Sequence, residues 1–289
     1  MFTKDSDQVV SLFDMQCMWY EIECGRAHLA TGNHGKALKN FLAVVNHFAD
    51  FIEDQFDFHS YCVRKMTLRA YVKLLDLEDR IMSNPFYSRA ATGAVAEYLA
   101  LHDTTDTSAK DAEDEEALLA AMDSAERKRY KAKKRKEAAR KAKAEEEEAA
   151  AAAAKEKAEK GKKGGATRER DPDPEGKKLA ATTDPLGEAT KLVVALKTNA
   201  AGQMETHTAA FEVYLRKGRL LLALAAVKAA HKIGGADHPD AFRLLVRLVD
   251  AVGKVPAQGA EGAPAAVVHA VISEELQELL GGAELGSYV

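Results

Sequence analysis

The residues with the clearest chemical capability are the Lys and Arg side chains between positions 127 and 143. Eleven of these seventeen residues are basic, and one, Glu137, is acidic. The basic residues are Arg127, Lys128, Arg129, Lys131, Lys133, Lys134, Arg135, Lys136, Arg140, Lys141 and Lys143. On one helix they would place positive charge around the whole circumference, and such a surface contacts phosphate backbones without reading bases. Tyr130 is the one side chain here that could stack on a base, so the run predicts binding to a folded RNA rather than to a single strand.

The acidic residues on either side leave two alternatives open. Four consecutive glutamates, at positions 145–148, follow the basic run. An acid-only stretch precedes it, with Asp111, Glu113, Asp114, Glu115, Glu116, Asp123 and Glu126. These acids could neutralise the basic side chains within the molecule, or the whole segment could be a solvated charged helix without a ligand. The glutamates limit the expected polyanion surface to residues 127–143, and the residues from 145 onward are expected to be a spacer.

Residues suited to enzymatic chemistry are sparse. The sequence contains no glycine-rich nucleotide-binding loop, no Gly-x-Ser-x-Gly motif and no His-Glu-x-x-His zinc motif. His59 and Cys62 could form a base–nucleophile pair on one helix, but no acid is placed to orient the histidine. We therefore expect no catalytic residue, no cofactor, no metal site and no small-molecule substrate.

Trp19 is the only tryptophan of the chain. Tryptophan is usually mostly buried, which favours an anchor of the hydrophobic core. It is also enriched at protein–protein interfaces, which favours an anchor for a partner protein. Both interpretations of Trp19 remain open from the sequence.

The bulk composition excludes several classes of protein. The 289 residues are 46% hydrophobic and 30% charged, and the formal net charge of -4 excludes a uniformly basic nucleic-acid binder. Three cysteines, Cys17, Cys24 and Cys62, are odd in number and lack C-x-x-C spacing, which indicates a reducing compartment. No apolar run approaches the ~20 residues of a membrane helix, and the N-terminus has no apolar signal-peptide core. We therefore expect a cytosolic or nuclear protein with no membrane partner.

The segments around the basic run have helical periodicity, which predicts an all-α fold. Residues 15–48 should form two helices joined by a turn at 31–33, and residues 205–239 should repeat this unit. In both copies a glycine and an alanine are five residues apart: Gly32 with Ala37, and Gly218 with Ala223. A helix–turn–helix unit of about 34 residues is typical of tetratricopeptide repeats, whose small positions include Gly25 and whose bulky plug is Phe41. Such units pack side by side into an α-solenoid.

The remaining segments complete a four-part organisation. Further helices are predicted at residues 56–77, 85–103, 185–200, 241–252 and 265–280. A polar break is expected at 103–110, followed by a charged helix from 111 to 160, about 75 Å long. The predicted parts are a repeat block at 1–103, the charged low-complexity segment at 104–165, a flexible linker at 166–184, and a C-terminal helical block with an Ala/Gly-rich tail at 185–289.

Four stretches carry a resemblance to a known family. They are DMQCMWYEIECGRA from Asp14, DQFDFHSYCVRKMTLRAYVKLLDLED from Asp54, NPFYSRAATGAVAEYLALHD from Asn84 and ETHTAAFEVYLRKG from Glu205. With the charged segment between them, they resemble the C-terminal portion of the auxiliary subunit of the N-terminal acetyltransferase A (NatA) complex. The resemblance extends from about Phe2 to Val249, and the segment after Val249 is expected to have no counterpart.

The resemblance implies a function as a scaffold. Members of the family are α-solenoids that wrap the small catalytic acetyltransferase subunit, tune its active site and dock it on the ribosome near the nascent-chain exit. The auxiliary subunit has no acetyl-transfer chemistry of its own, and acetyl-CoA would be bound by the catalytic subunit. The expected partners are therefore the catalytic subunit, with Trp19 as the candidate interface anchor, and ribosomal RNA, contacted through residues 127–143. Association with ribosomes would make the protein cytoplasmic. A generic helical-repeat adaptor with a charged spacer helix is the alternative.

The resemblance also implies what this chain lacks. Family members are much longer upstream, so the N-terminal repeats, much of the catalytic-subunit cradle and a basic inositol-polyphosphate pocket are expected to be missing. Met1 is expected to be an internal methionine of a longer protein. A solenoid cut in this way would expose a repeat face, so partial disorder is expected over residues 1–14.

Overall fold

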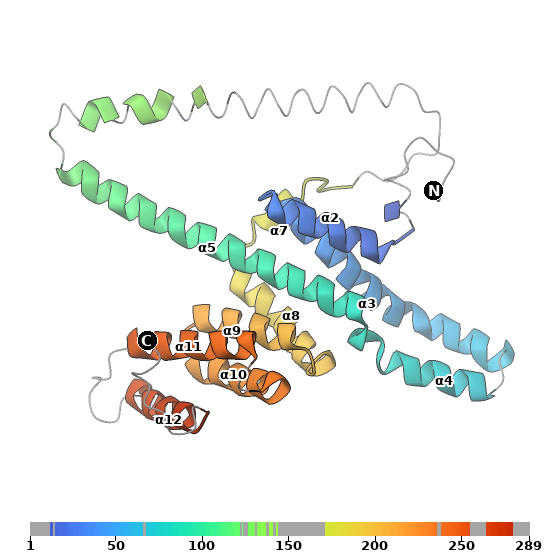
Figure 1. Ribbon diagram of the computed structural model, residues 1–289. Helices are drawn as coiled ribbons and strands as arrows, with labels where there is room; N and C mark the ends of the chain where they lie inside the picture. The colour runs from blue at the N-terminus through green and yellow to red at the C-terminus, as the bar shows by residue number, and fades with distance from the viewer. Residues whose placement is uncertain are drawn as a thin grey trace, which may run out of the picture. The chain divides into compact units, whose positions relative to one another are not determined.

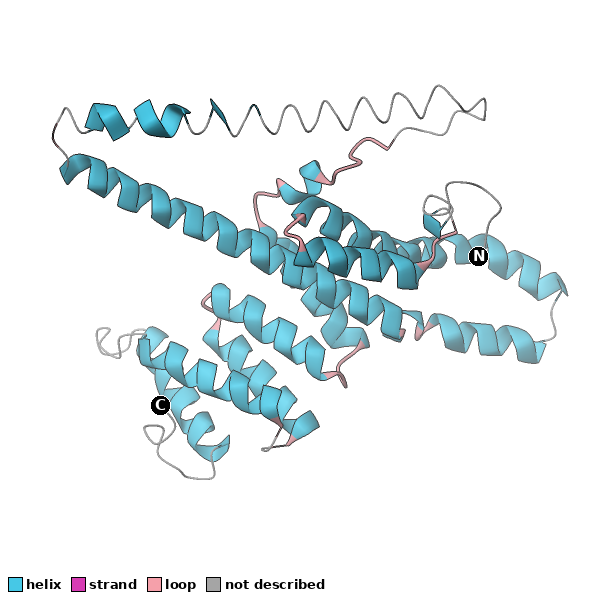
Figure 2. Ribbon diagram, turned by 45° about the horizontal axis from the view of Figure 1, so that its top comes forward, coloured by secondary structure: helices cyan, strands magenta, loops and turns pink. Residues whose placement is uncertain are grey.

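The computed structural model describes residues 12–13, 15–65, 68–121, 123, 127–130, 132–136, 139–140, 143, 171–235, 238–254 and 264–279. Within these ranges every regular element is a helix, as the periodicity predicts (Figure 1; Figure 2). The chain divides into two compact units, one made of residues 1–103 and 173–289 and the other of residues 104–172. Apart from residues 12 and 13, the segment 1–14 with its expected disorder lies outside the described residues, as does the Ala/Gly-rich end at 280–289.

The predicted N-terminal hairpin is present. Helix α2 (Met18–Ala30) and helix α3 (His34–Lys65) are joined by a short turn in which Gly32 has a φ of 71°. Helix α3 is longer than expected, because residues 48–56 contain neither Gly nor Pro to end it. The predicted separate helix at 56–77 is therefore wrong. Its first part belongs to α3 and its second part to α4 (Leu68–Glu78), which a single 3₁₀ turn, η1 (Ile81–Ser83), follows.

Helix α5 (Pro85–Ala121) begins at the proline predicted to start it. The predicted polar break at 103–110 is wrong, since α5 passes through it without interruption. That segment is polar but contains no Gly or Pro, and polarity alone does not end a helix. No new helix begins at Asp111, and the described helical residues of the basic run begin at Arg127. The expected extension of that helix over 144–160 lies outside the described residues.

The end of the predicted linker is packed rather than loose. Residues 171–176 lead into a short helix, α7 (Lys177–Ala180), which packs on α3. Lys39 Nζ donates a hydrogen bond to the Asp173 carbonyl at 2.7 Å, and the Lys36 ammonium lies 2.8 Å from the Glu175 carboxylate. Residues 173–180, which belong to the predicted flexible linker at 166–184, are packed on α3 in this way, and residues 166–170 lie outside the described residues.

Within its described residues, the C-terminal block consists of five helices: α8 (Pro185–Asn199), α9 (Met204–Arg216), α10 (Leu220–Gly234), α11 (Pro239–Lys254) and α12 (Pro264–Leu279). Each predicted helix of this block is confirmed to within a few residues. The Asp184 carboxylate caps α8 by accepting a hydrogen bond from the Gly187 amide at 2.8 Å. Helices α9 and α10 form the second predicted hairpin, and its turn glycine, Gly218, has a φ of 64°.

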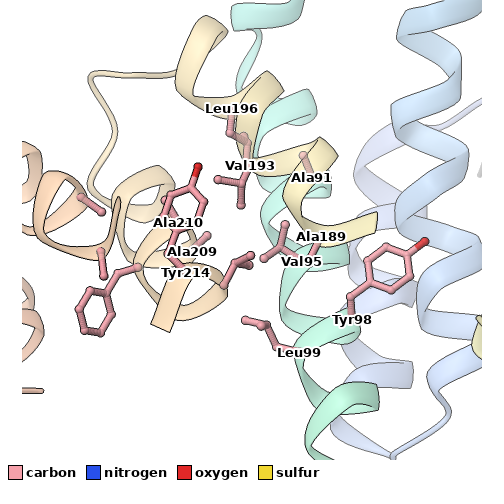
Figure 3. Packing of buried hydrophobic residues seen from close by; sticks show 14 of the residues in the cluster. Ala91, Val95, Tyr98, Leu99, Ala189, Val193, Leu196, Ala209, Ala210 and Tyr214 are labelled. Carbon is pink, nitrogen blue, oxygen red and sulfur yellow. The ribbon is translucent and has the colours of Figure 1, made fainter. Parts of the chain in front are cut away.

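The first half of α5 joins the two hairpin blocks of the larger unit. On one side the fully buried Phe41 ring of α3 fills the space between α2 and α5. A Cβ atom added at Gly25 would lie 2.8 Å from this ring, and one added at Gly93 would lie 2.5 Å from it. Figure 3 shows the other side, where Val95 of α5 lies near Ala189 and Val193 of α8. The predicted plug, Phe41, is thus confirmed, and α5 is the helix that both blocks share.

Candidate protein and polyanion contact surfaces

The basic side chains of residues 127–143 are exposed wherever they are described. The exposed residues are Arg127, Lys128, Arg129, Lys133, Lys134, Arg135, Lys136, Arg140 and Lys143. Lys131 and Lys141 lie outside the described residues. Residues 133–136 are consecutive and helical, and successive side chains on a helix are turned by about 100°. Positive charge therefore faces in several directions, which is the arrangement that the polyanion hypothesis requires. The contact itself stays a prediction.

Trp19 lies on the surface. Its side chain is 52% exposed, and its ring meets Tyr20 edge-on with centroids 5.8 Å apart. Phe13 meets the same tyrosine at 5.3 Å, so three aromatic rings gather at the start of α2. The core-anchor interpretation of Trp19 is therefore wrong, and α2 instead contributes the buried residues Glu21, Ile22 and Gly25. A role for Trp19 at a partner interface stays a prediction.

The described side chains form no metal site and do not include the His59–Cys62 pair. His59 and Cys62 are both in α3, but their side chains lie outside the described ones. Within the described ranges no three His, Cys, Asp or Glu side chains are placed to hold a metal ion. A helix long and apolar enough to cross a membrane is likewise not found there.

Two carboxylate–imidazole pairs fasten α3 to its neighbours. Glu21 of α2 accepts a hydrogen bond from His47 Nε2 at 2.9 Å, and Glu97 of α5 bonds to His34 Nδ1. Both glutamates are buried, and Glu97 Oε2 has no hydrogen-bond partner. Burial raises the pKa of Glu97 above its ordinary value, although the hydrogen bond with His34 opposes this shift. The sequence did not indicate these pairs, since glutamates in amphipathic helices are usually solvated.

A network of four charged residues links α5, α9 and α11. Arg216 makes a bidentate pair with Asp103, with Nε–Oδ1 and Nη2–Oδ2 distances of 2.8 and 2.7 Å. Its Nη1 also donates to Glu212 at 2.8 Å, and Arg247 Nη2 donates to the same carboxylate at 3.0 Å. The Arg247 guanidinium additionally lies over the Phe211 ring, 5.5 Å from its centroid. These contacts hold α5, at Asp103, against helices α9 and α11 of the C-terminal block.

The charge network lowers the pKa values of both its acids. The hydrogen bond from Arg216 is the main cause for Asp103, whose partial burial acts in the opposite direction. Burial alone would raise the pKa of Glu212, but hydrogen bonds from Arg247 and Arg216 lower it overall. The two carboxylates are therefore held in their ionised forms.

Two hollows lie beside α5 and share part of their lining. The larger, about 590 Å³, is lined by residues of α2, α3, α5 and α9, including Arg26 and Arg89. The smaller, about 330 Å³, is lined by residues of α5, α9 and α11. Thr92, Ala96 and Glu205 line both hollows, so the two hollows adjoin each other along α5. Volumes of this size are in the range of ligand-binding pockets.

Comparison with known proteins assigns the family. A sequence model of the family described as "N-terminal acetyltransferase A, auxiliary subunit" matches residues 1–230. The chain belongs to this family. The auxiliary-subunit resemblance seen in the four sequence stretches is thereby confirmed.

Two relatives illustrate how far the similarity of this NatA auxiliary-subunit chain extends. The chain is 48% identical over 247 residues to the N-terminal acetyltransferase A complex auxiliary subunit NAA15 of Arabidopsis thaliana. The aligned region covers 86% of this chain and 26% of the relative. It is 42% identical over 293 residues to N-alpha-acetyltransferase 16, NatA auxiliary subunit, of Mus musculus. This aligned region covers 99% of this chain and 33% of the relative. The expectation that the segment after Val249 has no counterpart is therefore wrong.

A solved structure supports the solenoid assignment. It is described as "Structure of Naa15/Naa10 bound to HypK-THB", and it matches with a TM-score of 0.62 at 29% identity. The match covers 96% of this chain and 31% of the solved chain. The predicted all-α, tetratricopeptide-like solenoid is confirmed. The chain spans about a quarter to a third of the length of the relatives it matches.

Acidification is expected to destabilise this NatA auxiliary-subunit chain through the charge network. The pKa values of Asp103 and Glu212 are lower in the folded state, so the unfolded carboxylates bind protons first, from about pH 4 downward. The stabilisation is present above the unfolded pKa values and is lost as the pH falls through the folded ones. Urea denaturation between pH 7 and pH 3 should show this loss.

The matched control is the Asp103→Asn, Glu212→Gln double variant. It should lose less unfolding free energy over the same pH range, because two of the titrating groups are absent. The raised pKa of Glu97 acts with the opposite sign, but it is present in both proteins and cancels in the comparison. Equal pH slopes for the two proteins would show that the network does not couple protonation to folding.

Proposed function

We propose that this chain is part of a non-catalytic scaffold of a NatA complex and contacts ribosomal RNA through residues 127–143. Its family membership supports the scaffold role. The exposure of nine described basic side chains is the observation that carries the RNA contact. Phosphate contacts of this kind give strong, salt-dependent binding without base specificity.

The scaffold role assigns the chemistry to a different subunit. The solved structure that this chain resembles contains Naa15 together with Naa10. By analogy, we propose that a catalytic acetyltransferase subunit binds a protein containing this chain, that this subunit binds acetyl-CoA, and that the exposed Trp19 contributes to the interface. The assembly would work in the cytoplasm on ribosomes.

Charge reversal in the basic run is expected to weaken ribosome binding. The test variant changes Lys131, Lys133, Lys134, Arg135 and Lys136 to Glu. We expect at least tenfold weaker co-sedimentation with ribosomes near 150 mM salt, and a flatter dependence of binding on salt, because fewer phosphates are neutralised. Co-sedimentation at several salt concentrations measures both quantities.

A second variant controls for net charge. It reverses five exposed basic residues outside the run: Arg69, Lys73, Lys191, Arg219 and Lys232. The net charge changes by the same amount, so a general electrostatic effect would weaken both proteins equally. Only a loss confined to the first variant supports the proposed contact surface.

Pull-down with a catalytic acetyltransferase subunit tests the scaffold role separately. The scaffold proposal predicts enrichment of that subunit, reduced when Trp19 is changed to Ala. A generic helical-repeat adaptor with a charged spacer would not enrich it. Failure of enrichment would therefore reject the scaffold role while leaving the RNA contact to the sedimentation test.

A further inference from the structure

Residues 104–172, here called the insertion, are fastened to the larger unit at both ends. Asp103, the residue before the insertion, accepts two hydrogen bonds from Arg216 of α9, at 2.8 and 2.7 Å. Asp173, the residue after it, accepts a hydrogen bond through its carbonyl oxygen from Lys39 of α3 at 2.7 Å. Both partners belong to the larger unit. The chain therefore leaves this unit and rejoins it at two points that side chains of the unit hold in place.

The C-terminal fastening consists of residues 173–180, here called the clip. The Asp173 carboxylate accepts hydrogen bonds from the Lys177 and Lys178 amides, at 2.9 and 2.8 Å. These amides are at the start of α7 and would otherwise lack a partner within the helix. Leu179, at the other end of the clip, is partly buried against the hydrophobic core. The clip thus has local structure of its own and an apolar side chain that anchors it.

A contact between two backbones fixes the position of the clip on α3. Gly35 and Gly176 are both buried, and Gly176 has a φ of 64°. A Cβ atom added at Gly35 would overlap the Glu175 carbonyl oxygen and would lie 2.7 Å from the Gly176 carbonyl oxygen. Beside this contact, the Lys36 ammonium lies 2.8 Å from the Glu175 carboxylate. The backbones approach this closely because both positions lack a side chain, so the clip has a specific binding position.

The parts of the larger unit before and after the insertion also share a hydrophobic core. Figure 3 shows Val95 of α5 near Ala189 and Val193 of α8, and all three residues are buried. This core, the clip and the pair formed by Asp103 and Arg216 all join residues 1–103 to residues 173–289. None of these contacts uses a side chain of the insertion.

We propose that the clip and the shared core hold residues 1–103 and 173–289 together when the insertion is cut by an endoprotease. Hydrolysis adds one water at each cut peptide bond and leaves a carboxylate and an amine, and it breaks none of the contacts described above. Two cuts, one on each side of the basic run, would release the polyanion surface and leave the larger unit assembled. Cleavage would therefore separate the RNA contact from the scaffold role. Only this last consequence rests on the proposed function.

The test uses the full chain with a recognition sequence for a site-specific protease inserted after Ala121 and another after Ala154. After complete cleavage, we expect the two end fragments to co-elute in size-exclusion chromatography at micromolar concentration, and the middle fragment to elute separately. Circular dichroism should retain the helical signal of the end fragments. The midpoint of thermal unfolding should become dependent on protein concentration, because folding then joins two separate chains.

Gly35→Ala tests the clip itself. The added Cβ atom would displace the clip, whereas alanine favours the helix of α3 more than glycine does. We expect the dissociation constant of the cleaved end fragments to rise about tenfold, as for a steric clash in a packed contact. Gly253→Ala is the matched control, because a Cβ atom added there meets no atom within 4 Å, and the constant should change less than about twofold. Circular dichroism before cleavage confirms that both variants fold.

Two results would overturn the proposal. The first is separation of the end fragments at micromolar concentration after cleavage. The second is an equal dissociation constant for the Gly35→Ala and Gly253→Ala proteins, which would show that the clip contributes nothing to the association. Co-sedimentation of the cleaved sample with ribosomes tests the RNA contact independently. End fragments that stay together and still bind ribosomes would reject the contact through residues 127–143 while supporting the clip.

Discussion

Phe41→Ala should lower the free energy of unfolding by about 3–5 kcal/mol, the range for truncating a fully buried phenylalanine. The ring is completely buried and contacts Gly25 of α2 and Gly93 of α5. Three helices therefore lose packing at once. The two glycines have no side chains that could move into the space, so the cavity should remain largely unfilled. Urea or thermal denaturation monitored by circular dichroism measures the loss.

Phe51→Ala is the matched control for this substitution. Phe51 is on the same helix and has the same side chain, but it is 44% exposed. Its removal should change the free energy of unfolding by no more than about 0.5 kcal/mol, as is usual at surface positions. A similar loss in the two variants would mean that Phe41 does not act as the plug between α2, α3 and α5.

Arg216→Met should lower the free energy of unfolding by about 2 kcal/mol. Methionine retains much of the aliphatic stem but leaves Asp103 without its bidentate partner and Glu212 with Arg247 alone. Removing one partner of a fully buried ion pair costs about 3–5 kcal/mol. The Arg216 and Glu212 side chains are 24% and 19% exposed and Asp103 is 50% exposed, so solvent screening should reduce that cost.

Two further measurements assign the cost of Arg216→Met to the charge network. Arg243→Met removes an arginine that is 55% exposed and has a partner one helical turn away, so its cost should stay within about 0.5 kcal/mol. Raising the salt concentration to 1 M should change the Arg216→Met difference only partly, because partly buried pairs are screened less than exposed ones. If Arg243→Met lowered the free energy of unfolding as much as Arg216→Met, the loss at Arg216 could not be assigned to its contacts with Asp103 and Glu212.

The helix boundaries show where periodicity was sufficient and where it was not. Starts at Pro85 and Pro185 and the turns at Gly32 and Gly218 were predictable, because proline and glycine act through local backbone geometry. The ends of α3 and α5 were not predictable in this way. Helices were predicted to end at residues 48 and 103, but without Gly or Pro beyond these positions both helices continue.

The candidate surfaces also differ in whether the sequence alone could predict them. The basic run could be found from composition, since eleven like charges in seventeen residues cannot be buried together. The exposure of Trp19 could not, because tryptophan occurs in both cores and interfaces. The two hollows beside α5 gave no sequence signal either. Arg26 and Arg89, which line the larger one, are 63 residues apart, and each taken alone resembles an ordinary surface residue.

Local rules were therefore enough for the all-helical class, the hairpin turns, the Phe41 plug and the family resemblance. These depend on residues close together in the chain or on a pattern that repeats along it. Three features depend on residues brought together from distant positions: the docking of residues 173–180 on α3, the link between Asp103 and Arg216, and the lining of the two hollows. The last two form because α5 packs against both hairpin blocks, and the packing of one helix against two others is not encoded in the periodicity of any one of them.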